Sequence, residues 1–99
     1  MVTTCEIAKI AKVKVVDAAG DKLIKNDDAC AFLKAALEVG ATIIGMEGFY
    51  VKEGLRVPDM AFIADFSDIQ DSNESIDSAI KLLSQLTPRE DYYLDFVFR

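Results

Sequence analysis

Residues 41–57 read ATIIGMEGFYVKEGLRV, and the order of residue types in this stretch predicts a β-hairpin. Its first part, residues 41–51, is apolar, rich in β-branched residues and interrupted by Gly45 and Gly48, which is typical of a central strand rather than a helix. The same glycines predict a bulge or a close approach of another part of the chain. Residues 52–54 form a turn sequence, after which residues 55–57 and 60–66 can run back antiparallel to the first strand. Pro58 cannot donate a ladder hydrogen bond, so we expect it at an edge or a break.

One helix is predicted on each side of the hairpin. Before it, Asn26 can cap a helix whose apolar residues recur every three or four positions and which Gly40 ends. After it, a second helix starts at Ser72 or Asn73, because acidic residues suit its first turns and apolar residues recur at helical spacing. Thr87-Pro88 is expected to stop this helix.

The two ends of the chain predict further strands. From residue 7 to residue 16, apolar and lysine residues interleave, which predicts a half-exposed strand. Residues 17–21 form a turn, and Leu23-Ile24 is either a short return strand or a link to the first helix. Residues 92–98 alternate, with Tyr92, Leu94, Phe96 and Phe98 on one side of a last strand. The order of elements predicts a ferredoxin-like βαββαβ plan, an α+β fold in which two helices cover one face of an antiparallel or mixed four-stranded sheet.

Length and composition favour a single domain over residues 1–99. The chain is 52% hydrophobic and 28% charged, which suits one packed core. The longest apolar stretches are broken within a few residues by charge or glycine, so we expect no membrane segment. Cys5 and Cys30 lie far apart and fit no metal-ligand spacing, which predicts reduced thiols in a cytoplasmic protein.

The residue types present argue against catalysis and cofactor binding. The chain has no histidine, the commonest general base near neutral pH. Residues 45–48 lack the third glycine and the following helix of a nucleotide-binding loop. Acidic residues at every third position between Asp65 and Asp71 do not match a calcium loop. We therefore expect no metal, no cofactor and no enzyme activity. Glu47 interrupts an apolar strand, so it is either a catalytic carboxylate with a raised pKa, a partly exposed residue, or a partner for Arg56.

The distribution of charge is the strongest remaining signal. The net charge is -6, which disfavours direct binding to nucleic acid or anionic lipid. Six carboxylates follow one another without an intervening lysine or arginine: Asp59, Asp65, Asp68, Asp71, Glu74 and Asp77. Such a run is either a solvated face that favours the helix dipole, or a negative surface that replaces phosphates in a basic cleft. Nearby aromatic residues, Phe49 and Tyr50, are either core residues or anchors for a partner.

Three segments resemble the immunity proteins that neutralise colicin-type, tRNA-anticodon-cleaving ribonucleases. They are residues 31–36 (AFLKAA), 40–49 (GATIIGMEGF) and 54–56 (GLR). The shared pattern is a helix, a glycine, an apolar strand ending Gly-apolar-acid-Gly, an aromatic residue, and then Gly-apolar-Arg. Phe49 and Tyr50 stand where that family carries a tryptophan and a histidine. The first 25 residues have no counterpart in the pattern.

The resemblance implies a cytoplasmic inhibitor that occupies the RNA-binding cleft of a basic toxin nuclease as a substrate mimic. It implies a protein partner, with no direct contact to nucleic acid or membrane, and a monomer or weak dimer. The partner-binding residues expected on this basis are Glu47, Phe49, Tyr50, Glu53, Asp65, Asp68 and Asp71. The alternative function is a ferredoxin-like regulatory module that binds a small molecule as a dimer. The glycine-rich strand and the tyrosine-rich last strand suggest this alternative.

Overall fold

The computed structural model describes residues 3–18, 20–53, 55–85 and 91–98. Its helices are α1 (Thr4–Ala11), α2 (Ala29–Glu38) and α3 (Ser72–Leu83), and a 3-10 turn, η1 (Asn26–Asp28), leads into α2. Its strands are β1 (Val15–Ala18), β2 (Asp21–Lys25), β3 (Ile43–Lys52), β4 (Leu55–Asp65) and β5 (Tyr92–Phe98). The predicted α+β class is confirmed.

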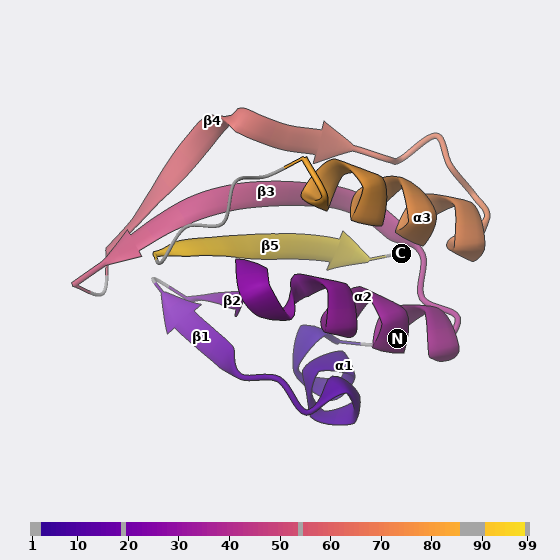
Figure 1. Ribbon diagram of the computed structural model, residues 1–99, viewed down its shortest axis with the longest axis horizontal. Helices are drawn as coiled ribbons and strands as arrows, with labels where there is room; N and C mark the ends of the chain where they lie inside the picture. The colour runs from indigo at the N-terminus through magenta and orange to yellow at the C-terminus, as the bar shows by residue number, and fades with distance from the viewer. Residues whose placement is uncertain (1–2, 19, 54, 86–90, 99) are drawn as a thin grey trace.

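The strands form one antiparallel sheet in the order β1-β2-β5-β3-β4 (Figure 1). The prediction of a four-stranded sheet is therefore wrong, because β1 adds a strand beside β2. The hairpin of β3 and β4 is confirmed, and Pro58 lies on β4, at the edge of the sheet. The pairing shifts between Glu47 and Gly48, where residues 60–62 of β4 have no counterpart on β3. The bulge expected near the glycines is present at this point.

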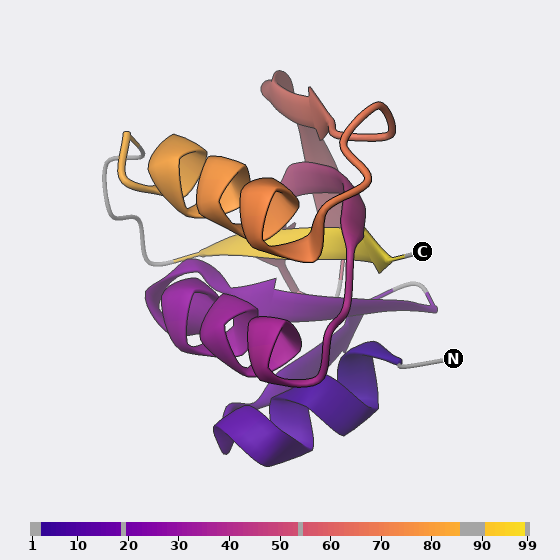
Figure 2. The ribbon, with the colours of Figure 1, turned by 90° about the vertical axis from the view of Figure 1, so that its right-hand side faces the viewer.

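The predicted two-helix layer is also present. In Figures 1 and 2, α2 and α3 lie side by side on one face of the sheet. The main core lies between this layer and the sheet, and Phe32 of α2 stacks on Phe96 of β5 with ring centroids 5.1 Å apart. Tyr92, Leu94, Phe96 and Phe98 all contribute to this core, as the alternation predicted. Gly40 follows α2 with φ of 73°, the left-handed conformation that ends many helices.

The beginning of the chain differs from the prediction. Residues 7–16 were expected to form a strand, but α1 occupies Thr4–Ala11 and β1 begins only at Val15. Thr3 caps α1, because its side chain accepts a hydrogen bond from the Glu6 backbone and donates one to the Glu6 carboxylate. Ile7 is completely buried in the main core. Packing of this face makes the helix more favourable than the strand that the lysine alternation suggested.

A second, smaller core lies on the opposite face of the sheet. It consists of Ala18, Leu23 and Phe49, with Val51 and Tyr93 packed against it. Figure 2 shows the β1–β2 hairpin extending away from the helical layer, so the sheet is curled. Arg56 of β4 closes this region, since its Nε lies 2.9 Å from an Asp21 carboxylate oxygen and its guanidinium lies 5.0 Å from the centre of the Phe49 ring. Among the described residues, Ile63 and Val97 remain exposed on the rest of this face.

Candidate functional site

The acidic run from Asp59 to Asp77 is divided by the fold. Asp59 is partly buried, and it accepts a hydrogen bond of 2.8 Å from the Tyr92 hydroxyl. Asp65 ends β4, Asp68 lies in the loop that follows, and Asp71 is the N-cap of α3. Figure 1 places this loop and the start of α3 at one end of the molecule. Asp59 is thus partly buried and bonded within the protein, whereas the later carboxylates are exposed.

The open face of the sheet gathers carboxylates and apolar side chains from three strands. Glu47 of β3 is the cross-strand partner of Asp95 on β5 and of Ile63 on β4. Gly45 is likewise the partner of Val97 and Asp65. Cross-strand partners point to the same side of a sheet, and diagonal neighbours such as Glu47 and Asp65 lie about 7–8 Å apart. We call the set Glu47, Ile63, Asp65, Asp95 and Val97 the sheet-face patch.

The sheet-face patch is electrostatically unbalanced. Burial, together with the charges of Asp21 and Glu47, raises the pKa of Asp95 from 3.8 to about 6, although Arg56 acts in the opposite direction. Like charges placed directly opposite on neighbouring strands destabilise each other. Among the described residues the ion pairs are Lys22–Asp17, Arg56–Asp21 and Lys81–Asp77, and none of them includes a carboxylate of the patch. A cation from outside would relieve this repulsion.

The apolar members make the patch suitable for contact with a macromolecule. Ile63 is 52% exposed and Val97 is 47% exposed. Gly45 lies between Val97 and Asp65 in the register and carries no side chain that could cover them. Apolar contacts around a charged contact exclude water and strengthen it. The patch therefore combines a negatively charged centre with an apolar border.

The carboxylates near α3 have local structural roles as well. Hydrogen bonds from Ser67 hold the pKa of Asp65 below its ordinary value, and the backbone bond measures 2.8 Å. Asp71 accepts a bond of 2.9 Å from the Glu74 backbone and so caps α3. Asp77 pairs with Lys81 one turn later at 3.1 Å. Helix capping and pairing explain part of the acidic run without a partner.

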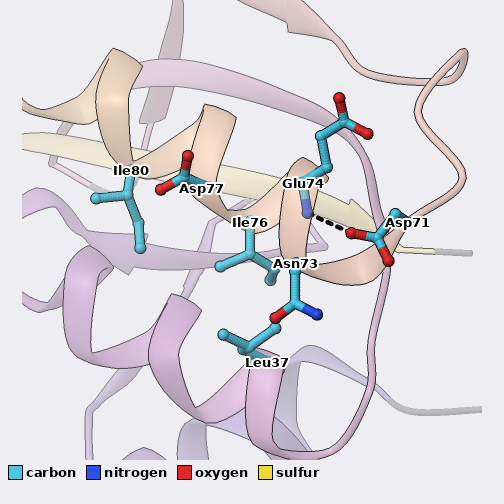
Figure 3. Close-up of a pocket in the computed structure, with 7 residues that line it drawn as sticks. All are labelled: Leu37, Asp71, Asn73, Glu74, Ile76, Asp77 and Ile80. Carbon is cyan, nitrogen blue, oxygen red and sulfur yellow. Dashed lines mark hydrogen bonds between the residues drawn. The ribbon is translucent and has the colours of Figure 1, made fainter.

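A groove separates α2 from α3 on the helical side of the molecule (Figure 3). Its volume is about 490 Å³. Leu37 of α2 faces Ile76 and Ile80 of α3 across it, and polar side chains of α3 border it. We call this feature the helix groove, and its lining residues are Leu37, Asp71, Asn73, Glu74, Ile76, Asp77 and Ile80.

The fold brings together only some of the residues predicted to bind a partner. Glu47 and Asp65 are exposed and share the sheet-face patch. Phe49 is 2% exposed beneath Arg56, and it offers no surface to a partner in this structure. Tyr50 points to the helical side, where its ring packs edge-on against Tyr92 with centroids 5.0 Å apart. Glu53 is exposed in the turn after β3, at the opposite end of that strand, about 24 Å along it from the pairing with Asp65.

Asp95 is the site residue that sequence reasoning missed. It is the only charged residue in β5, where it interrupts the apolar sequence YYLDFVF. Glu47 interrupts β3 in the same manner and was singled out for that reason. The same signal was therefore available for Asp95, but the proximity of the two carboxylates depends on the β3–β5 register, which the sequence pattern does not specify.

The described residues offer little for metal or redox chemistry. In that part of the chain, no group of three or more histidine, cysteine, aspartate or glutamate side chains is arranged to hold a metal ion. Cys5 and Cys30 are free and exposed. No helix in residues 3–18, 20–53, 55–85 and 91–98 has the length and apolar character needed to cross a membrane.

Comparison with known proteins identifies no relative of this chain. The chain matches no protein-family model, no curated protein and no solved structure.

Proposed function

We propose that this chain is a non-enzymatic binding protein whose sheet-face patch occupies a positively charged groove on a protein partner. The observation that carries this proposal is the placement of Glu47 opposite Asp95, with Asp65 diagonal to Glu47. Asp95 is stabilised when a lysine or arginine approaches, because a charge-assisted hydrogen bond offsets its burial and the like charges of Asp21 and Glu47. Exposed Ile63 and Val97 give the same contact an apolar border.

The partner class that we infer is a ribonuclease, specifically a tRNA-cleaving bacterial toxin, which the chain inhibits as an immunity protein. A groove that binds RNA is lined with lysine and arginine side chains that contact successive phosphates. Carboxylates in series can occupy those contacts, so the chain would act as a mimic of RNA. Asp68 extends the same negative sign beyond Asp65. The resemblance of residues 31–56 to ribonuclease immunity proteins supports the same class, since it includes Glu47.

The experiment is inhibition of tRNA cleavage by a basic, tRNA-cleaving toxin nuclease, with affinity measured by calorimetry. The test variant is Glu47→Gln/Asp65→Asn/Asp95→Asn. A matched control, Asp27→Asn/Asp28→Asn/Glu38→Gln, removes the same amount of charge at the two ends of α2. We expect the test variant to lose at least about tenfold in affinity, since close charge pairs at interfaces contribute about 1.5–7 kcal/mol. Absence of inhibition, or equal losses in the two variants, contradicts the proposal.

A dimeric regulatory module is the second candidate. The exposed Leu55 and Val57 on edge strand β4 favour it, because a second copy would cover them. Pro58 and the bulge at residues 60–62 weigh against it, since both features hinder edge-to-edge pairing of strands. The chain begins with α1 and β1, which the strand-helix-strand-strand-helix-strand plan assumed for such a module does not include. Sedimentation equilibrium with and without metabolite mixtures distinguishes the regulatory module from the nuclease inhibitor, because a ligand-dependent dimer is expected only for the module.

A further inference from the structure

We propose that the helix groove is a second docking site, which binds a basic amphipathic helix of a protein partner. The site lies between α2 and α3, on the side of the sheet opposite the sheet-face patch. The inference therefore goes beyond the proposed function and does not depend on it.

The floor of the helix groove requires an apolar occupant. Leu37 is 36% exposed on α2, and it faces Ile76 and Ile80 of α3 (Figure 3). Ile76 is almost completely buried beneath the groove, so Leu37 and the half-buried Ile80 supply its accessible apolar surface. A volume of about 490 Å³ accommodates side chains such as leucine or phenylalanine from one face of a helix. Burying these side chains together with Leu37 removes apolar surface from water on both partners.

The border of the helix groove requires a basic occupant. Asp71, the N-cap of α3, and Glu74 and Asp77 within the helix line it at intervals of three residues. Glu74 and Asp77 both lie within α3 and are separated by about 4.5 Å of helix rise, the same rise that separates lysine or arginine residues three positions apart on a docked helix. One of the described ion pairs, Lys81–Asp77, includes a residue of the helix groove, and both of its side chains are well exposed. A pair of this kind is weak and easily exchanged for a contact with a partner.

Charge complementarity also distinguishes between partner classes. A nucleic acid or an anionic membrane would bring negative charge to a negative border, and it lacks an apolar ridge that fits the floor. A basic amphipathic helix satisfies both parts of the groove at the same time, with its apolar stripe on Leu37 and Ile80.

The test is fluorescence anisotropy with a labelled Leu/Lys amphipathic helical peptide of about 14 residues, since shorter isolated helices are marginal in water. A Leu/Glu peptide of the same pattern and a Leu/Lys peptide of scrambled order serve as probe controls. We expect the amphipathic Leu/Lys peptide to bind more tightly than both controls. Amide shifts in heteronuclear NMR spectra are expected to concentrate on α2 and α3.

The variants separate this site from the sheet-face patch. Glu74→Gln/Asp77→Asn removes two border charges and leaves the Asp71 cap of α3 intact. It should weaken peptide binding by about tenfold, whereas Glu47→Gln/Asp95→Asn, with the same charge change on the other face, should leave binding unchanged. Equal weakening by both variants, or amide shifts centred on β3 and β5, means that only the net charge attracts the peptide and overturns the inference. Because nuclease inhibition is measured separately, failure here leaves the proposed function standing.

Discussion

Replacement of Gly48 by alanine is expected to destabilise the protein strongly, because a tyrosine ring occupies the space of the missing side chain. A Cβ atom at position 48 would lie 1.9 Å from the Tyr92 hydroxyl oxygen and 2.5 Å from its Cζ atom. Tyr92 is 1% exposed and cannot move into solvent without leaving the main core. Its ring also packs edge-on against Tyr50 and Phe62. Glycine is required here because β5 approaches β3 closely with an aromatic side chain.

The magnitude follows from the contacts that Tyr92 has to give up. Overpacking of a well-packed core costs about 1–3 kcal/mol. Displacement of the hydroxyl also disturbs its bond of 2.8 Å to Asp59, and loss of a hydrogen bond to a charged group costs about 1.5–3 kcal/mol. A combined loss of about 3 kcal/mol in the free energy of unfolding would lower the Tm by roughly 12–24 °C for a domain of this size.

Gly45→Ala is the matched control on the same strand. Its Cβ would lie 3.8 Å from the nearest atoms, which is ordinary van der Waals contact. We expect that variant to be unchanged or slightly more stable, by up to about 1 kcal/mol, because alanine restricts the unfolded chain. Urea and thermal unfolding followed by circular dichroism measure both variants. If Gly48→Ala were as stable as Gly45→Ala, the close approach of Tyr92 and the pairing of β3 with β5 would be refuted.

Two further variants test the electrostatics and the buried polar contact. The pKa of Asp95 rises from 3.8 to about 6 on folding, so the folded state holds this proton more tightly than the unfolded state. The contribution of Asp95 to stability therefore falls as pH rises from about 4 to about 6, and this fall is measured as a decrease in the urea midpoint. Asp95→Asn should remove the decrease. If the pH profile of that variant equals the original profile, the raised pKa of Asp95 is contradicted. Ser75→Ala should cost about 1–3 kcal/mol, because the buried hydroxyl accepts the Ile43 N–H at 3.2 Å and donates to the Ser72 carbonyl at 3.0 Å. Exposed Ser84→Ala is its control, and equal stability of the two would refute the role of Ser75.

Much of the fold is predictable from local patterns. The hairpin, the helix after Ser72 and the alternation of residues 92–98 appear in the structure where the sequence places them. The N-terminal helix was missed because Lys12-Val13-Lys14-Val15-Val16 alternates like a strand, while the signal for a helix was only a threonine followed three residues later by Glu6. Lys12 in fact adopts a left-handed conformation with φ of 58° and ends α1. The stop expected at Thr87-Pro88 lies outside the described residues; α3 ends at Leu83.

The candidate site was less predictable than the fold. A period of two indicates that Phe49 and Tyr50 point to opposite faces, but it does not indicate which face is covered. The curl of the sheet and the β1–β2 hairpin bury Phe49, and neither feature is local to residue 49. Glu47 and Asp95 are far apart in sequence, and they meet because β5 inserts between β2 and β3. Strand order depends on long-range packing, so sequence patterns identified Glu47 but neither Asp95 nor the pairing of the two.

The most direct test of the sheet-face patch is proton release on binding. Asp95 is about half protonated near pH 6, and a partner cation placed beside it lowers its pKa. Calorimetry of the complex with the basic nuclease near pH 6, in two buffers of different ionisation enthalpy, gives the number of protons released. We expect release of up to about half a proton per complex, and its loss in Asp95→Asn. A binding enthalpy that does not depend on the buffer, or proton release that persists in Asp95→Asn, would contradict the claim that this patch receives the positive groove.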